Sequence, residues 1–368
     1  MRNVVIARDP VAQAAGQLLV GEGGGAVDVV LGAMLAGAAR SSPASLLGAC
    51  GVLVAGTGVG AHFVDGRARA PGLGDRRPRT PEPTPDAWTA AVPGLLEGVL
   101  AAHARFGALP FGQVVRAAVA AVREGEVDDG LRERLKLLLQ LPRTGIHALE
   151  RMGILQAVMN AAGPVVGGVF TKDDLRPVPA PVLARPACVE AGHEALLPPR
   201  RSGRYGANLP DPLPSAPVES VVAVDMHGVV AAASWVVCPS AVDLPGAPGL
   251  ALASLLPRAK KGVPRWRPGE ALPVPLPVAV LLHEHSAWAG VGVSGHGDVT
   301  AARDAAVTAR LANGGVTMAL GDGGASGGGR DAVALWAMRE GDGDDVHTAV
   351  LDASGAAAEP AHEAADAG

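Results

Sequence analysis

The chain has 368 residues, of which 48% are hydrophobic and 18% are charged, and its formal net charge at pH 7 is −5. This composition supports a folded core and excludes a largely disordered chain. The weak negative charge, without a basic stripe, argues against nucleic acid as a partner, and no apolar run is long enough to span a membrane.

The first half of the sequence predicts mostly helices. Strands are expected at residues 3–7, 51–55 and 62–64. Helices are expected at residues 10–19, 26–36, 94–105, 111–124 and within 128–163. Leu135, Leu138, Leu139 and Leu141 would form the apolar face of the last helical segment. Residues 66–87, rich in proline and arginine, are expected to form an exposed connection.

The second half of the sequence predicts mostly strands. These are expected at residues 187–197, 219–225, 229–237, 277–282, 287–294, 332–338 and 346–351. The runs at 219–225 and 229–237 would form a hairpin around His227 and Gly228, and one helix is expected at 298–313. Because strands and helices come in blocks, a layered α+β or αββα fold is favoured over a parallel doubly wound sheet.

The three cysteines and the N-terminus favour the cytoplasm. Cys50, Cys188 and Cys238 are odd in number, widely spaced and set among apolar residues, so we expect buried thiols in a reducing compartment. The first residues lack the apolar stretch and cleavage site of a signal peptide.

Seven segments in one order resemble the gamma-glutamyltransferase (gamma-glutamyltranspeptidase) family, nearly end to end. They are GGGAVD at 23–28, DGRARAP at 65–71, VPGLLEG at 92–98, FGALP at 106–110, VREG at 122–125, FTKDDL at 170–175 and LPPRRSG at 197–203. The resemblance implies the αββα sandwich of N-terminal-nucleophile hydrolases, in which self-cleavage exposes a threonine whose own amine acts as its base. It also implies a single domain over 1–368, with a large-subunit-like part at 1–217, a small-subunit-like part at 218–352 and a loose tail at 353–368.

The nucleophile position of that family holds valine in this chain. The family's TTHxSVVDxxGN hairpin is similar to residues 218–229, and Asp225 and Gly228 set a register that puts Val218 where threonine belongs. Valine has no hydroxyl and cannot act as a nucleophile toward an amide. Ser220 would point to the same face of the strand and is the possible substitute, with Glu219 before it as a shifted cleavage junction.

Most supporting residues implied by the resemblance are also replaced. The strand expected to orient the nucleophile reads SWVVC at 234–238, the paired serines fall on Pro273 and Val274, and the acidic substrate-gripping motif falls on residues 252–258 without a carboxylate. The oxyanion-like loop falls on Gly295 and His296. Arg67 alone keeps its match, as the arginine that would bind the substrate carboxylate.

Other motifs are better explained as turns. The GEGGGA segment at 21–26 lies between helices, so it is not a dinucleotide site, and His283-Glu284-His285 lacks a third metal ligand. The glycine-rich segment 321–329 lacks the lysine of a phosphate loop, and the acidic turn at 342–345 lacks calcium-loop spacing. No metal or cofactor is therefore expected.

Two functions remain open from the sequence. One is a shortened gamma-glutamyltransferase-like pseudoenzyme, a scaffold that binds another protein chain or forms a homo-oligomer, because a helical block is missing between residues 203 and 218. The other is an active amide hydrolase or transferase that uses Ser220 after self-cleavage.

Overall fold

The computed structural model describes residues 3–74, 86–176, 180–183, 186–190, 193–199, 216–238, 240–256, 266–283, 286–312, 332–339 and 346–352. The predicted tail at 353–368, the glycine-rich segment 321–329 and the acidic turn at 342–345 lie outside these residues, as do Glu284 and His285.

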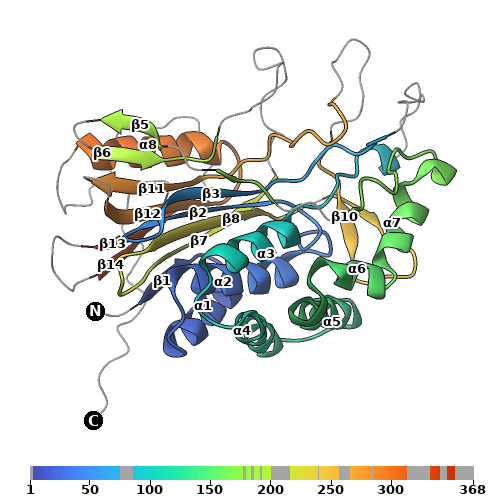
Figure 1. The fold of residues 1–368 in the computed structure, drawn as a ribbon, viewed down its shortest axis with the longest axis horizontal. Coiled ribbons are helices and arrows are strands. Elements are labelled where there is room, and N and C mark those ends of the chain that lie inside the picture. Colours follow the sequence, from blue (N-terminus) through green and yellow to red (C-terminus); the bar gives the residue numbers. More distant parts are fainter. Residues whose placement is uncertain are drawn as a thin grey trace.

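Two six-stranded antiparallel sheets form the centre of the molecule (Figure 1). The first sheet has the order β1 (Val4–Ala7), β7 (Val218–Val224), β8 (Val230–Val236), β2 (Cys50–Gly56), β3 (Gly60–Gly66) and β4 (Val182–Leu183). The second has the order β14 (Val346–Asp352), β13 (Val333–Arg339), β12 (Ser286–Ser294), β11 (Val278–His283), β6 (His193–Leu196) and β5 (Pro186–Glu190). The first sheet therefore combines strands from both halves of the chain, whereas the second sheet is built from residues after 185.

Helices lie on the outer sides of the sheets (Figure 1). They are α1 (Pro10–Gly21), α2 (Ala26–Ser41), α3 (Leu95–Phe106), α4 (Phe111–Arg123), α5 (Asp129–Thr144), α6 (Ala148–Arg151), α7 (Ile154–Ala162) and α8 (Val299–Ala312). Short 3₁₀ turns occupy η1 (Asp86–Trp88), η2 (Gly145–His147) and η3 (Pro164–Val166). The α1–α4 group covers the first sheet, whereas in the described part of the chain α8 alone covers the second.

Alternation along β7 assigns its side chains to two cores. Val221 and Ala223 pack in the core under the helices, whereas Val222 and Val224 pack in the core between the sheets. This is the period-two pattern of a strand buried on both faces. The sheets approach closely because β12 has glycine where a Cβ at Gly290 would lie 2.4 Å from the Val222 side chain.

The β7–β8 turn ties the two sequence halves together. Asp225 Oδ1 accepts hydrogen bonds from the main-chain N–H groups of His227 (2.9 Å) and Val229 (3.0 Å), and Gly228 takes the left-handed φ of 76° that the turn needs. Asp225 Oδ2 accepts from the N–H of Ala26, the first residue of α2, at 3.2 Å. The hairpin predicted around His227 and Gly228 is confirmed.

The αββα sandwich predicted from the sequence is confirmed, and most of the expected elements lie within a few residues of their predicted bounds. The sequence did not predict a small two-stranded sheet of β9 (Ala241–Asp243) and β10 (Ala251–Ala253). These strands are too short for an alternating pattern to stand out.

The prediction of an exposed connection at 66–87 was wrong for its described N-terminal part. Residues 66–72 are almost entirely buried, and Arg69 forms isolated bridges with both Val92 and Ala271. Charge and proline content did not reveal that this segment runs between two other chain segments and pairs with them. Leu139, assigned to the apolar face of its helix, is 40% exposed, whereas Leu135, Leu138 and Leu141 are buried.

Within the described ranges, no helix has both the length and the apolar character needed to cross a bilayer.

Candidate functional site

Val218, at the predicted nucleophile position, is the first residue of β7 and lies at the seam between the two sheets. Its side chain is fully buried and packs in a small apolar cluster with Val293, Val299 and Ala332. On the neighbouring strand it lies opposite Val236. The nucleophile position is therefore filled by hydrocarbon and offers no hydroxyl.

The main chain of Val218 connects the two sheets. Its N–H donates to the carbonyl of Gly295 at 3.0 Å, and the N–H of Gly295 donates to the carbonyl of Val218 at 2.8 Å. Gly295 has a φ of 142°, a conformation that favours glycine. In the predicted oxyanion-like loop, the Gly295 N–H is thus already bound, and the neighbouring residue His296 is exposed.

Ser220 is fully buried and engaged. Its hydroxyl donates to the carbonyl of Val293 at 2.8 Å, and its N–H donates to Oγ of Ser294 at 2.9 Å. The strand β12 lies close by, because a Cβ on Gly292 would come within 2.8 Å of Cβ of Ser220. A hydroxyl held in this way is neither accessible to a substrate nor directed at one.

Ser234 lies directly opposite Ser220 on β8 and is also fully buried. Its hydroxyl has no hydrogen-bond partner among the described residues, and the same holds for the indole Nε1 of Trp235 next to it. The two residues project to opposite faces of the sheet, since neighbours on a strand alternate. Ser234 therefore shares a face with Ser220, and Trp235 packs in the core under the helices.

Glu219 is the ionisable group of this seam. Burial raises the pKa of its carboxyl, and a hydrogen bond with the Ser294 hydroxyl and the charge of Arg8 partly oppose the shift. Its Oε2 atom is buried without a partner in the described part of the structure. A carboxyl with a raised pKa is a feature of some catalytic bases, but here the adjoining serines lie in a closed interior.

Arg67 lies at the same end of the first sheet as Val218 but three strands away. Glu219, Trp235, Cys50 and Gly66 lie in one row across neighbouring strands, so the two regions are about 14 Å apart at ~4.8 Å per strand. The guanidinium of Arg67 binds Asp65 in bidentate fashion, with Nε–Oδ1 at 2.8 Å and Nη2–Oδ2 at 2.5 Å. Its side chain is 8% exposed and its charge is already paired.

The segments expected to carry the other substrate groups do come near Arg67. The N–H of Leu272, just before Pro273 and Val274, donates to the carbonyl of Ala68 at 2.8 Å. Residues 252–256 also lie in this region, since the N–H of Ala91 donates to the carbonyl of Ala253 at 3.0 Å. The scaffold thus brings the predicted segments together, but they carry no carboxylate and do not carry the two adjacent serines of the family. The one hydroxyl in residues 252–256, that of Ser254, donates to the hydroxyl of Thr89.

Reasoning from sequence named Glu219 and Ser234 but missed that they and Ser294 come together at the seam. This juxtaposition became evident only from the pairing of β7 with β8 and the approach of β12. Strand parity places Ser220 and Ser234 on the inner face, but the register between strands is needed to put them opposite each other.

The αββα sandwich is shared with two solved structures that match most of this chain. The crystal structure of cephalosporin acylase from Bacillus halodurans is 14% identical, and the match covers 86% of this chain and 81% of that one with a TM-score of 0.63. The structure of LmbA2991HD is 14% identical, with 96% and 97% covered and a TM-score of 0.66.

A gamma-glutamyltranspeptidase from Pseudomonas nitroreducens, complexed with L-DON, also matches. It is 22% identical over 48% of this chain and 65% of that one, with a TM-score of 0.39, too low for a comparison of whole folds. No protein-family model and no curated protein matches the chain. The two neighbours with TM-scores of 0.63 and 0.66 establish the fold.

Proposed function

We propose that the protein is a gamma-glutamyltransferase-like pseudoenzyme that keeps the hydrolase scaffold and acts by binding a protein chain. The observation that carries the proposal is the burial of Val218, at the nucleophile position, among Val293, Val299 and Ala332. Because a side chain without a hydroxyl cannot cleave its own chain or attack an amide, the chemistry of the class has no starting point here.

Two further features support the loss of chemistry. The Gly295 N–H that would stabilise an oxyanion is bound by the carbonyl of Val218, and Arg67 is neutralised by Asp65. A site that recognises an amino acid needs a free cation for the carboxylate and an anion for the ammonium group. Among the described residues of the expected substrate segments, Arg67 is already paired and no carboxylate takes the place of the acidic motif.

The proposed partner is a second copy of the chain or another protein. The unequal helical cover of the two sheets supports this, since in the described residues α8 alone covers the outer face of the second sheet. We also place the protein in the cytoplasm, because Cys50 and Cys238 are buried free thiols.

Intact-mass measurement of the purified protein tests the loss of chemistry. We expect one species with the mass of the whole chain and no release of amine from gamma-glutamyl substrates. Two fragments that result from cleavage between Glu219 and Ser220 would instead support the amide hydrolase that uses Ser220. Cleavage abolished by Ser220→Ala would complete that contrary result.

Light scattering during size-exclusion chromatography tests association. We expect a dimer at micromolar concentration or a partner recovered from the native cell. A monodisperse monomer for which no partner is recovered would contradict the binding function without restoring the enzymatic one.

A further inference from the structure

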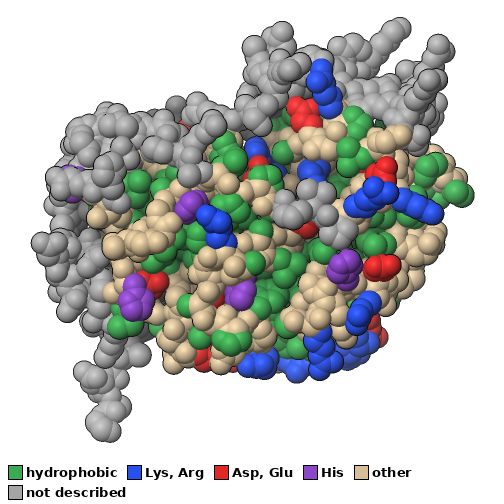
Figure 2. All heavy atoms as spheres, viewed as in Figure 1, with side chains coloured by type: hydrophobic (Ala, Val, Ile, Leu, Met, Phe, Trp, Pro, Cys, Tyr) green, Lys and Arg blue, Asp and Glu red, His purple; other side chains and the backbone are tan. Residues whose placement is uncertain are grey.

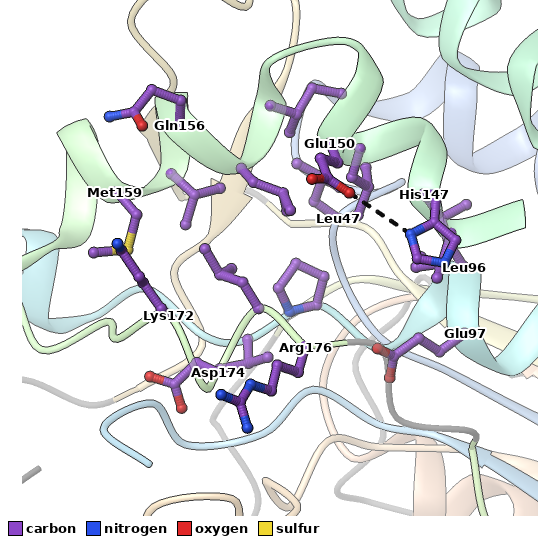
Figure 3. A pocket seen from close by; sticks show the side chains of 18 residues that line it. Leu47, Leu96, Glu97, His147, Glu150, Gln156, Met159, Lys172, Asp174 and Arg176 are labelled. Carbon is purple, nitrogen blue, oxygen red and sulfur yellow. Dashed lines mark ion pairs between the residues drawn. The ribbon is translucent and has the colours of Figure 1, made fainter. Parts of the chain in front are cut away.

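A cavity of about 350 Å³ lies away from the nucleophile seam, between α3 and the η2–α6–α7 segment (Figure 3). This volume falls in the range of small-molecule sites. Its floor is apolar and buried, formed by Leu47, Leu96, Leu149, Ile154 and Val158. Figure 2 shows apolar side chains over this part of the surface, with basic and acidic side chains around them.

One wall of the cavity is a turn held rigidly by a buried carboxylate. Asp174 is 3% exposed and accepts hydrogen bonds from the N–H groups of Gly72 (2.8 Å), Leu73 (3.0 Å) and Thr171 (2.8 Å). These bonds use the charge of Asp174 and fix the turn that carries Lys172 and Arg176. The wall is therefore built before any ligand arrives, which reduces the cost of binding.

The charges at the cavity mouth are mostly paired. Glu97 binds Arg69 at 3.0 Å, Arg176 binds Asp173 at 3.0 Å, and Glu150 lies 3.7 Å from His147. Lys172 differs, because its side chain is exposed and no ion pair or hydrogen bond is found for its ammonium group among the described residues. It is the cation at this mouth that can accept a new partner, and Figure 3 places it on the same side of the cavity as Met159.

We propose that this cavity binds a small amphipathic carboxylate, with the apolar chain on the leucine and valine floor and the carboxylate at Lys172. The apolar floor supplies non-directional affinity, and the unpaired ammonium supplies the preference for an anionic head group. The site does not depend on the seam at Val218, so it stands whether or not the protein has lost its hydrolytic chemistry.

Titration calorimetry with octanoate, octan-1-ol and octylammonium on the full chain tests the proposal. For a ligand of about ten non-hydrogen atoms we expect saturable binding of octanoate at about millimolar affinity or better. We expect octan-1-ol to bind about tenfold more weakly and octylammonium more weakly still, because a charge-assisted pair is lost or replaced by repulsion. Absence of octanoate binding, or equal binding of all three, would overturn the proposal.

Two variants with matched controls locate the site. Lys172→Glu changes an exposed residue and should lower the affinity for octanoate about tenfold or more while leaving the affinity for octan-1-ol unchanged. Lys136→Glu on α5 should change neither affinity. Leu155→Trp should fill the cavity and abolish both, whereas Leu18→Trp, at a half-exposed leucine on α1, should not.

A folding failure of one variant does not leave the proposal untested. Circular dichroism identifies such a failure, and Met159→Trp then fills the same cavity from the next turn of α7. Octanoate affinity that is unchanged in a folded cavity-filling variant would place the ligand elsewhere and refute this site.

Discussion

The main chains of Val218 and Gly295 pair in both directions, at 3.0 and 2.8 Å, and so connect the start of β7 to the end of β12. This pairing occupies the N–H of Gly295, which lies in the loop that the resemblance assigns to oxyanion binding. It also buries the side chain of Val218, at the position of the nucleophile. The same pairing therefore involves both the expected oxyanion loop and the expected nucleophile position.

Restoring a hydroxyl at Val218 should destabilise the protein without restoring self-cleavage. A buried hydroxyl among Val293, Val299 and Ala332 has no partner, so Val218→Thr should lower the free energy of unfolding by about 1–3 kcal/mol. Urea denaturation and intact mass measure the two effects. Val222→Thr, also fully buried between the sheets, is the matched control, and two fragments from Val218→Thr alone would contradict us.

The paired serines should differ in their contribution to stability. Ser220→Ala removes the hydrogen bond to the Val293 carbonyl and should cost about 1–2 kcal/mol. Ser234→Ala removes a buried hydroxyl without a described partner and should change stability by less than about 0.5 kcal/mol or increase it. Equal losses in chemical denaturation would show that the two hydroxyls share a bond.

Glu219 should make stability depend on pH. Its pKa is raised by burial, so the protonated carboxyl is favoured in the folded state. The associated stability is complete below the ordinary glutamate pKa of about 4.3 and is lost as pH rises through the raised value. Glu219→Gln should therefore stabilise the protein at neutral pH, with a gain that vanishes at acidic pH. Exposed Glu22→Gln should show no such pattern in denaturation curves collected between about pH 4 and 8.

Removing one charge of the buried Asp65–Arg67 ion pair should destabilise the protein. Their side chains are 10% and 8% exposed, so Asp65→Asn leaves a buried guanidinium without its counter-charge and should cost about 3–5 kcal/mol. Glu133→Gln, which removes the partner of exposed Lys136 on α5, should cost less than about 1 kcal/mol. Similar losses from both changes would mean that the Asp65–Arg67 pair is not sheltered from water.

Free glutamate and glutathione should not be ligands. Because Arg67 is bound by Asp65, its guanidinium is not free for an α-carboxylate. Millimolar concentrations of either compound should leave the melting temperature unchanged, while a saturable rise would show that Arg67 exchanges Asp65 for the ligand.

The layers and most elements follow from local patterns in the sequence. Alternation in residues 218–224, the Gly228 turn and the helical periodicity before residue 163 predict β7, its hairpin and the helical cover. These signals are local, and the motif order supplied the long-range arrangement.

The seam and the cavity depend on contacts between residues far apart in the sequence, which local sequence patterns do not predict. The approach of Ser294 to Ser220 joins residues 74 positions apart, and Asp174 holds Gly72 across 102 positions. Polarity suggested that residues 66–72 were exposed, but the pairing of Arg69 with two separate segments buried them. Such partners become visible only when the chain is folded.

The interleaving of both sequence halves in the first sheet has a kinetic consequence. In that sheet β7 and β8 from the second half lie between β1 and β2 from the first. The first half alone cannot complete this sheet, so the search for native contacts spans most of the chain. Non-local strand pairing of this kind slows folding, typically to milliseconds or longer. During synthesis on the ribosome, β1 and the free edge of the β2–β3 hairpin would therefore wait without their partner strands until residues beyond 230 emerge, and in that interval the nascent chain is most exposed to aggregation and most dependent on chaperones.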